Sequence, residues 1–394
     1  MSRLLVCCPQ DIPSSNMAAF LRRNGDWEDM GSDGSNSYMR RGEDVMITIP
    51  GLHITSEDID SAAKAFGSLT GIKPTGTPHL GNYLGAIRPA LELSKTYDTV
   101  YFIADYHALT TVQNGAEMRA NIYKIAATWL ALGLNPEEGL FYKQSDIPEI
   151  FELSWALSCF TPKGFMNRAH AYKDKVAKNE AAGEDPDANV NMGLYCYPCL
   201  MDADILMFGA DIVPVGKDQK QHVEFARDIA IKFNKHFGED VFTIPEPVFQ
   251  ETTGIIPGLD GRKMSKSYDN VIDIFLESKA LKKKIGKIVT NSQGIEEPKD
   301  PETCNVFKLY KLFATPEQTE ALAARYRAGG MGWGHAKQEL QNVLEEHLGA
   351  AREKYFYLLD HTEEIDKILA YGKEKARVKS KAMMEKVRSL LGTY

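Results

Sequence analysis

Short apolar segments alternate with longer amphipathic segments between residues 68 and 215, and this alternation constrains the fold of the chain most strongly. Segments of strand length cover residues 68–72, 99–104, 139–142 and 211–215. Helix-like patterns cover residues 82–95, 116–132, 149–160 and 195–208. Strands that alternate with helices in this way form a parallel sheet with crossover helices. We therefore expect an α/β fold whose ligands bind beyond the carboxyl ends of the strands.

The segments on either side of this region differ from it in character. Residues 1–66 carry strand-like runs at 4–8 and 44–49 around a polar stretch that contains Trp27, so we expect a small α+β appendage of unknown role. Residues 179–193 are rich in polar residues, alanine and glycine, which predicts an exposed, flexible loop. Helix-like patterns dominate after Asp269. Three domains follow, at residues 1–66, 67–299 and 300–394.

Composition excludes several classes of protein. A chain of 394 residues that is 43% hydrophobic can bury large cores in more than one domain. No apolar run is long enough to cross a bilayer, so we expect a cytoplasmic protein with no membrane contact. Six cysteines do not make a disulfide framework in a chain of this length. The pair Cys196 and Cys199 lacks the further ligands of a zinc site, so we expect structural thiols and no protein-bound metal.

Two basic clusters stand out against the formal net charge of −8. The first lies within residues 279–287 and the second within residues 373–388. Their members are Lys282, Lys283, Lys284 and Lys287 in the first, and Arg377, Lys379, Lys381, Lys386 and Arg388 in the second. A nucleic-acid partner needs only a local basic face, but a solvated helix face has the same composition. Both interpretations are open.

Residues 74–82, Pro-Thr-Gly-Thr-Pro-His-Leu-Gly-Asn, join the first strand of the alternation to a helix. His79 stands at the expected start of this helix, where free N–H groups and the positive end of the dipole attract an anion. Gly76 and Gly81 allow the backbone to approach a ligand closely. An ordinary turn with a surface histidine would look similar.

Residues 263–267, Lys-Met-Ser-Lys-Ser, form a second segment that carries chemistry. The ammonium groups of Lys263 and Lys266 are suited to offset charge that develops on a leaving pyrophosphate. A basic surface loop is the alternative. Together, and in this order on an α/β domain, the two segments predict a site that holds and activates ATP without a P-loop.

A carboxylate in an apolar stripe suggests what else the site binds. A helix over residues 195–208 places Asp204 on one face with Tyr197, Met201, Ile205 and Phe208. A buried carboxylate must accept hydrogen bonds. Its donor is either a ligand group such as an indole N–H or a group of the protein core, and we expect Asp202 to face solvent. His107 is either a structural histidine or a wall of the pocket.

Residues 211–222 offer a second helix start at the same edge of the sheet. An apolar strand runs into Gly216, and Asp218 is followed three residues later by Gln221. This spacing matches a helix-start capping pattern. A normal strand–helix junction explains Asp218 but gives no task to Gln219.

The motifs taken together resemble those of the bacterial tryptophanyl-tRNA synthetases, which are class I aminoacyl-tRNA synthetases. The segments that carry the resemblance are residues 70–76, 79–87, 201–206, 213–222 and 263–267, and the similarity runs from about Ser68 to the C-terminus. The resemblance implies a Rossmann-type catalytic domain at residues 67–299 and a helical domain at 300–394 that binds the tRNA anticodon.

The resemblance also implies roles for individual residues. The catalytic set would be His79, Asn82, Lys173, Lys263 and Lys266. ATP would contact Lys73, Pro74, Thr75, Gly81, Asn82, Gly216, Lys217, Asp218, Ile255 and all five residues Lys263, Met264, Ser265, Lys266 and Ser267. Tryptophan would contact Leu69, His107, Met201, Asp204, Val213, Val215 and Gln219. The chain departs from the common family pattern at Lys73, Lys217 and Leu69, where glutamine, glutamate and an aromatic residue are usual.

The implied reaction has two steps. L-tryptophan is activated by ATP to tryptophanyl-adenylate and diphosphate, and the tryptophanyl group is then transferred to tRNA(Trp) for protein biosynthesis. Mg²⁺ would be held mainly by ATP, and the family implies a homodimer. Two alternatives remain at this point: a tyrosine-specific synthetase of the same architecture, and a non-catalytic paralogue that binds tryptophan or RNA.

Overall fold

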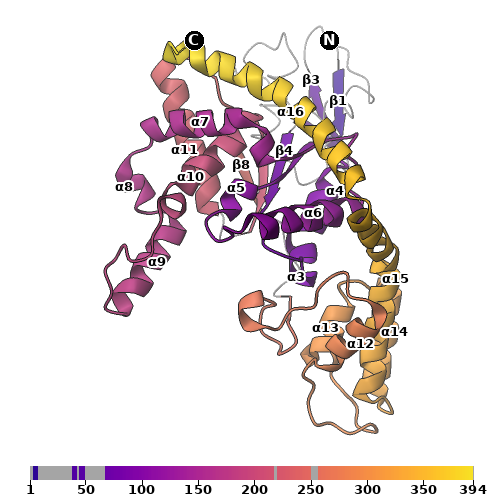
Figure 1. Cartoon of the computed structure of the whole chain (residues 1–394). Coiled ribbons are helices and arrows are strands. Elements are labelled where there is room, and N and C mark those ends of the chain that lie inside the picture. The colour runs from indigo at the N-terminus through magenta and orange to yellow at the C-terminus, as the bar shows by residue number, and fades with distance from the viewer. Residues whose placement is uncertain are drawn as a thin grey trace.

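A five-stranded parallel sheet lies at the centre of the molecule (Figure 1). The structure is a computed structural model, and it describes residues 3–7, 38–41, 44–48, 67–216, 220–249 and 256–393. The strand order is β6-β5-β4-β7-β8, with parallel pairing throughout. The strands are β4 (Gly67–Ile72), β5 (Asp98–Ile103), β6 (Leu140–Lys143), β7 (Ile212–Val215) and β8 (Glu246–Phe249).

The two faces of the sheet enter two separate hydrophobic cores, because successive side chains of a strand point to opposite faces. On β5, Tyr101 and Ile103 join one core and Val100 and Phe102 join the other. The first core includes residues of α6 (Gly115–Ala131) and α15 (Trp333–Asp360). The second includes residues of α7 (Pro148–Phe160), α10 (Met192–Met207) and α11 (Lys220–Phe237). Helices thus cover both faces, as a parallel sheet requires.

The α/β fold predicted from the alternation is confirmed. Each of the four predicted strands forms, with its ends shifted by at most one residue. β8 was not predicted, and it is a short edge strand that contains Pro247, a residue tolerated at the edge of a sheet. The short helices α5 (Asp105–Ala108) and α8 (Lys163–Met166) and the longer α9 (His170–Ala181) were also not predicted, whereas α11 begins at Lys220, within the segment 211–222 where a helix start was expected.

The helix expected over residues 82–95 has an interruption. It consists of α3 (Leu80–Asn82), a π-helical turn η1 (Tyr83–Ile87) and α4 (Arg88–Leu93). Single π-turns are rare and often lie at functional sites.

The loop expected at 179–193 is shorter than predicted, because α9 continues to Ala181 and α10 begins at Met192. The amide of the buried Asn179 donates to the carbonyl oxygens of Pro186 and Ala188 at 2.9 and 2.8 Å, which ties the connection together.

The N-terminal region contributes a separate antiparallel sheet of order β1-β3-β2. Its strands are β1 (Arg3–Cys7), β2 (Tyr38–Arg41) and β3 (Asp44–Thr48). The strands predicted at 4–8 and 44–49 correspond to β1 and β3, and β2 was not predicted. Trp27 lies outside the described residues.

The chain after Asp269 is mainly helical, as predicted. In the α/β region, a 3-10 turn η2 (Gln144–Asp146) precedes α7. The C-terminal part contains η4, α12, η5, α13, α14, α15 and α16. Their bounds are η4 (Lys266–Tyr268), α12 (Ser278–Gly286), η5 (Pro301–Thr303), α13 (Asn305–Tyr310), α14 (Pro316–Ala328) and α16 (Thr362–Leu391). Each described helix is too short or too polar to cross a bilayer.

The last helix, α16, packs on the α/β region. α16 runs back over the α/β region (Figure 1), and Ala376, Met384 and Val387 join the second core. A guanidinium nitrogen of Arg377 lies 2.9 Å from a carboxylate oxygen of Glu149 on α7. The end of the helical part, α16, therefore packs against the sheet.

Gly372→Ala is expected to loosen α16 from the sheet. A Cβ atom at Gly372 would lie 1.8 Å from the carbonyl oxygen of Phe141 on β6, and overpacking of this kind costs about 1–3 kcal/mol of unfolding free energy. Urea unfolding measures the loss. Gly349→Ala on α15 is the matched control, because its added methyl group meets no atom within 4 Å. Equal unfolding free energies for the two variants would contradict this account of α16.

Candidate active site

Residues 73–82, here called the histidine turn, connect β4 to α3 at the carboxyl end of the sheet. Gly76 has a φ angle of +98°, which residues with a side chain rarely adopt. His79 caps α3: its Nδ1 accepts the N–H of Asn82 at 3.3 Å, and Oδ1 of Asn82 accepts the N–H of His79 at 3.1 Å. This reciprocal capping box fixes the imidazole and the amide relative to each other. Lys73, Pro74, Thr75 and Gly81 lie in the same turn.

Residues 263–267, here called the lysine loop, are held by one buried side chain. Asn270 is only 2% exposed. Its Nδ2 donates to the carbonyl oxygen of Lys263 at 3.1 Å, and its Oδ1 accepts the N–H of Ser265 at 2.8 Å. Met264 is buried, so the loop is anchored by its middle. The exposed side chains of the loop are Lys263, Lys266 and Ser267.

The histidine turn and the lysine loop lie in contact. The Nζ atom of Lys266 donates to the carbonyl oxygen of Thr75 at 3.1 Å. The N–H of Leu80 donates to the carbonyl oxygen of Ile272 at 2.8 Å, just beyond the loop. Two segments far apart in the sequence are thus brought to one place, as the two motifs together predicted.

The charges in this region favour an anionic ligand. Burial, and secondly the charge of Lys266, lower the pKa of His79 to about 4. The imidazole is therefore neutral at pH 7, and since Nδ1 accepts a hydrogen bond, its proton resides on Nε2. Partial burial lowers the pKa of Lys266, and the charge of Asp273 acts in the opposite direction. A neutral N–H donor thus lies beside an ammonium group, an arrangement suited to phosphate oxygens.

Asp204 on α10 forms the second part of the site. Its side chain is fully buried. Nε2 of His107 lies 2.7 Å from Oδ2, and Nε2 of Gln144 donates to both carboxylate oxygens at 2.9 Å. Burial raises the pKa of Asp204, and the hydrogen bonds from His107 and Gln144 oppose that shift. The structure thus gives Asp204 protein donors, and its two oxygens, with about four acceptor positions, retain room for one more.

Tyr197 lies between the two parts of the site. Its ring meets the His107 ring edge-on with centroids 6.2 Å apart, and its hydroxyl lies 3.0 Å from Nε2 of His222. The Nζ atom of Lys73 lies 5.5 Å from the centroid of the same ring. A tyrosine therefore joins the Asp204 region to the histidine turn. The apolar residues predicted for this region belong to the second core or pack against it: Leu69 on β4, Val213 and Val215 on β7, and Met201 on α10.

Sequence reasoning missed two of these residues and misplaced a third. Gln144 had no signal beyond its position directly after β6, and Tyr197 was placed on the face of Asp204 without a role. Asp202 does not face solvent: it is 1% exposed, and burial, with the charge of Asp204, raises its pKa. The reason is that α10 is packed on several sides, against α7, α11 and α16.

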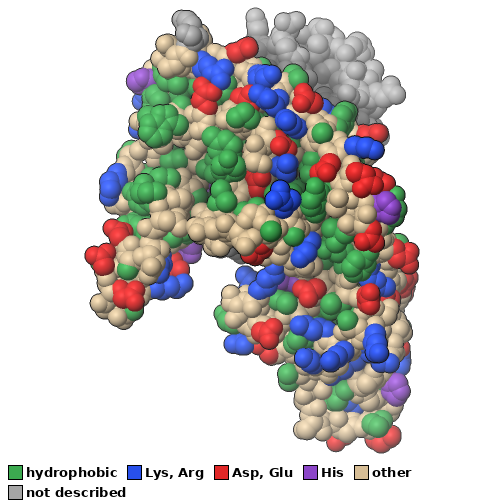
Figure 2. Space-filling view, in the orientation of Figure 1, with side chains coloured by type: hydrophobic (Ala, Val, Ile, Leu, Met, Phe, Trp, Pro, Cys, Tyr) green, Lys and Arg blue, Asp and Glu red, His purple; other side chains and the backbone are tan. Residues whose placement is uncertain are grey.

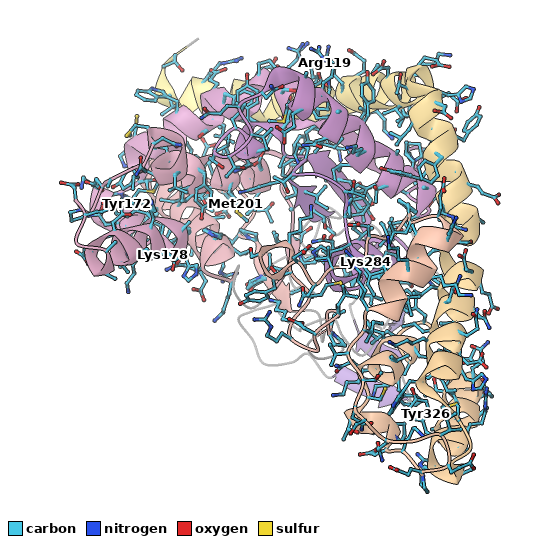
Figure 3. All side chains as sticks on the ribbon, turned by 60° about the horizontal axis from the view of Figure 1, so that its bottom comes forward. Arg119, Tyr172, Lys178, Met201, Lys284 and Tyr326 are labelled. Carbon is cyan, nitrogen blue, oxygen red and sulfur yellow. The ribbon has the colours of Figure 1, made fainter. Side chains whose placement is uncertain are left out.

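A cavity of about 420 Å³ opens beside His107 and Tyr197. Its remaining lining is largely apolar and includes Tyr106, Leu109, Phe151, Cys196 and Leu200. The space-filling view shows a wide hollow between α9 and the lower helical part (Figure 2). In Figure 3, Tyr172 and Lys178 mark α9 on one side, Tyr326 marks the helical part on the other, and Met201 lies between them.

One predicted site residue lies apart from the rest, and several others are outside the described residues. Lys173 is exposed on α9, and Figure 1 shows α9 and α3 apart from each other. Gly216 is exposed at the end of β7. Lys217, Asp218, Gln219 and Ile255 lie outside the described residues.

The two thiols on α10 have different surroundings. Cys196 is exposed, whereas Cys199 is buried, with its Sγ 3.7 Å from Sδ of Met166. Neither forms a disulfide. Within the described ranges, no group of three or more histidine, cysteine or acidic side chains is arranged to hold a metal ion.

The two basic clusters differ in what they contact. In the second cluster, Arg377 pairs with Glu149, and Arg388 donates to Glu152 at 2.7 Å through Nε. These arginines therefore anchor α16 rather than form a free basic face. Lys381 and Lys386 of the same helix are exposed, as are Lys279, Lys282, Lys283 and Lys287 in and after α12. Lys284, labelled in Figure 3, is partly buried.

Comparisons with known proteins point in one direction. A family model described as class I tRNA synthetases (W and Y) matches residues 61–349. The tryptophan–tRNA ligase of Pseudomonas aeruginosa is 52% identical over 328 residues, which are 82% of this chain and 73% of that protein. The enzyme of the same name from Campylobacter jejuni is 47% identical over 324 residues, 82% of this chain and 99% of that protein.

Solved structures give the same result. The crystal structure of tryptophanyl-tRNA synthetase from Campylobacter jejuni complexed with ADP and tryptophan has a TM-score of 0.77 at 46% identity. The match covers 83% of this chain and 100% of that one. A tyrosyl-tRNA synthetase from Archaeoglobus fulgidus shares only the fold, with a TM-score of 0.54 at 19% identity.

The neutral state of His79 predicts a specific sensitivity to acid. Its pKa of about 4 lies below the ordinary value of 6.5, so the unfolded chain binds a proton that the folded chain excludes between these pH values. The unfolding free energy should therefore fall as the pH drops from 6.5 to 4, by about 1–3 kcal/mol from this residue. Urea unfolding at pH 7 and pH 4.5 should show a smaller loss in His79→Gln than in the unaltered protein. His335→Gln, at an exposed position on α15, controls for the loss of one imidazole. An identical acid sensitivity in His79→Gln and the unaltered protein would refute the depressed pKa.

Proposed function

The chain belongs to the class I tRNA synthetases for tryptophan and tyrosine, and we infer from that membership and from its site that it is a tryptophan–tRNA ligase. It activates L-tryptophan with ATP and transfers the tryptophanyl group to tRNA(Trp). The observation that carries this assignment is identity of 52% and 47% to two tryptophan–tRNA ligases over 82% of the chain.

The first step needs positioning and charge stabilisation more than proton transfer. A carboxylate oxygen of tryptophan attacks the α-phosphorus of ATP, and the bond from that phosphorus to the bridging oxygen of the leaving diphosphate breaks. We propose that Lys263 and Lys266 stabilise the charge that develops on the diphosphate. His79, through Nε2–H, and Asn82 would hold phosphate oxygens. In support, Lys266 already lies against the histidine turn, 3.1 Å from the carbonyl oxygen of Thr75.

Further ATP contacts are proposed for the segments next to these groups. They are Lys73, Pro74, Thr75, Gly81, Gly216, Met264, Ser265 and Ser267, together with Lys217, Asp218 and Ile255 outside the described residues. Lys173 would reach the phosphates only if α9 moved toward α3. Mg²⁺ would be held mainly by ATP oxygens, because the histidine turn and the lysine loop present N–H donors and ammonium groups rather than carboxylates.

Recognition of tryptophan is proposed to depend on Asp204. The indole N–H would donate to the buried carboxylate, which His107 and Gln144 keep in place. Leu69, Met201, Val213 and Val215 would surround the ring, and Gln219 would approach the amino-acid head group. A ligand without an N–H leaves the carboxylate with one hydrogen-bond donor too few, which lowers the binding free energy by about 1–3 kcal/mol.

The tRNA partner is proposed to lie along the helical part of the molecule. The exposed lysines of α12 and the exposed Lys381 and Lys386 of α16 suit a phosphate backbone. Arg377 and Arg388 would not contribute, since they are paired with glutamates. Such contacts make the affinity for tRNA fall with added salt, and filter binding of tRNA at several salt concentrations tests this.

The proposed role in translation also implies that the enzyme works in the cytoplasm.

A homodimer is also proposed, because a large apolar surface surrounds the mouth of the cavity. Trp155 on α7 is 75% exposed and Met192 on α10 is 70% exposed, and hydrophobic side chains gather over these helices (Figure 2). Exposed patches of this kind mark interfaces. Analytical ultracentrifugation of the unaltered protein and of Trp155→Glu tests the proposal, and a monomer in the unaltered protein would refute it.

Tryptophan-dependent exchange of pyrophosphate into ATP is the experiment that tests the function. The unaltered protein should catalyse exchange with tryptophan and not with tyrosine. Asp204→Ala should lower kcat/KM for tryptophan by about tenfold to 200-fold, which corresponds to about 1–3 kcal/mol, and change the KM for ATP little. Asp202→Asn is the matched control on the same helix, a neutral isostere of an acid whose pKa is raised by burial. Exchange with tyrosine instead would indicate the other specificity of the family, and absence of exchange with either would favour a non-catalytic paralogue.

A further inference from the structure

Residues 270–276, here called the bridge segment, connect the lysine loop to the start of α12. At the first end, Asn270 holds the loop through Lys263 and Ser265. In the middle, the segment pairs with the histidine turn along the backbone. The N–H of Leu80 donates to the carbonyl oxygen of Ile272 at 2.8 Å. The N–H of Ile274 donates to the carbonyl oxygen of Pro78 at 3.3 Å. The position of the bridge segment therefore sets the register of the loop against the turn.

The other end of the bridge segment is held by α15. Nη1 of Arg352 donates to the carbonyl oxygen of Leu276 at 2.9 Å. Nη2 of the same guanidinium lies 2.6 Å from one carboxylate oxygen of Glu345. The other oxygen of that carboxylate accepts a hydrogen bond from the hydroxyl of Ser278. The Arg352 side chain is 17% exposed. Because the guanidinium is planar and donates in two directions, it can fix the backbone at Leu276 against α15.

Tyr355 supports the segment one turn further along α15. Its ring stacks on that of Phe275, with centroids 4.3 Å apart and an interplanar angle of 22°. Both side chains are 4% exposed. Burial raises the pKa of the Tyr355 hydroxyl, and the side chain of Thr77 in the histidine turn acts in the opposite direction. One buried side chain of α15 is thus packed directly against the bridge segment.

We propose that Arg352 and Tyr355 are positioning residues for ATP activation, acting through the bridge segment. The proposal rests on the proposed function. Neither side chain belongs to the histidine turn or the lysine loop, and their partners in the bridge segment are Phe275 and Leu276. They lie on one face of α15, three residues apart. The side chains of Lys263 and Lys266 are exposed, so the position of the lysine loop against the histidine turn depends on the backbone behind it, which the packed helix α15 supports.

The test replaces each residue with the smallest change that removes its contact. Arg352→Gln removes the charged fork, and Tyr355→Phe keeps the stacked ring and removes only the hydroxyl, whose pKa Thr77 influences. Each should lower kcat/KM for ATP in pyrophosphate exchange by about fivefold to fiftyfold, because a displacement of about 1 Å near the reacting groups can cost about 100-fold. The KM for tryptophan should change by less than about twofold. Arg352→Lys, which keeps one charged donor, should recover part of the loss.

Two control variants make the comparison specific. Arg325→Gln breaks an ion pair of similar length, 2.7 Å to Glu339, between α14 and α15. Tyr357→Phe removes a hydroxyl of α15 that donates to Glu364 at 2.6 Å. Both should leave the kinetics of ATP unchanged. If Arg352→Gln and Tyr355→Phe behave like the controls, or lose tryptophan and ATP activity equally, the positioning role is wrong.

Nucleotide binding gives a readout that does not depend on turnover. Calorimetry with a non-hydrolysable ATP analogue should show weaker binding by Arg352→Gln than by Arg325→Gln, at a temperature where thermal unfolding shows both variants folded. Equal affinities would overturn the proposal. Failure of the unaltered protein to exchange pyrophosphate with tryptophan would instead contradict the proposed function, and the analogue would still decide the positioning role.

Discussion

Backbone pairing between residues 78–80 and residues 272–274 is the interaction on which the rest of the nucleotide site depends. It joins the first strand–helix connection of the α/β region to a segment that follows the last strand of the sheet. Only with this pairing does the ammonium group of Lys266 lie against Thr75, and only then does its charge help to keep His79 neutral. The chemistry proposed for these groups is electrostatic, so distances of an ångström decide its strength.

The second part of the site is governed by the cost of burying a carboxylate. Asp204 lies in a largely apolar region and is fully buried, which would be unfavourable without donors. His107 and Gln144 meet this requirement before any ligand enters. The carboxylate is thus an acceptor that is already in position, and in the tryptophan pocket that we propose, an indole N–H takes its remaining acceptor position. Tyr197, beside His107 and Lys73, links this pocket to the histidine turn.

The helical part of the molecule is joined to the catalytic region at two places rather than by a flexible connection. α16 packs on the sheet through Gly372, Ala376 and Val387, and its arginines pair with glutamates of α7. α15 shares the first core with α6 and holds the bridge segment through Arg352 and Tyr355. Helices that are proposed to contact tRNA therefore also support the site where tryptophan is activated.

The sequence by itself determined the α/β class, the first four strands of the parallel sheet and the two segments that we propose to bind the nucleotide, because periodicity and turn residues are local signals. It also placed Asp204 on an apolar face, since that follows from helical spacing. Tertiary structure alone decided that Gln144 and Tyr197 belong to the site, that Asp202 is buried and that Arg377 and Arg388 anchor a helix. Each of these depends on contacts between segments far apart in the chain, and a basic or acidic residue on a helix has the same local pattern whether it faces solvent, a ligand or another helix. The same reason applies to β8 and to the π-turn at Tyr83, whose conformations are set by the elements packed against them rather than by their own residues.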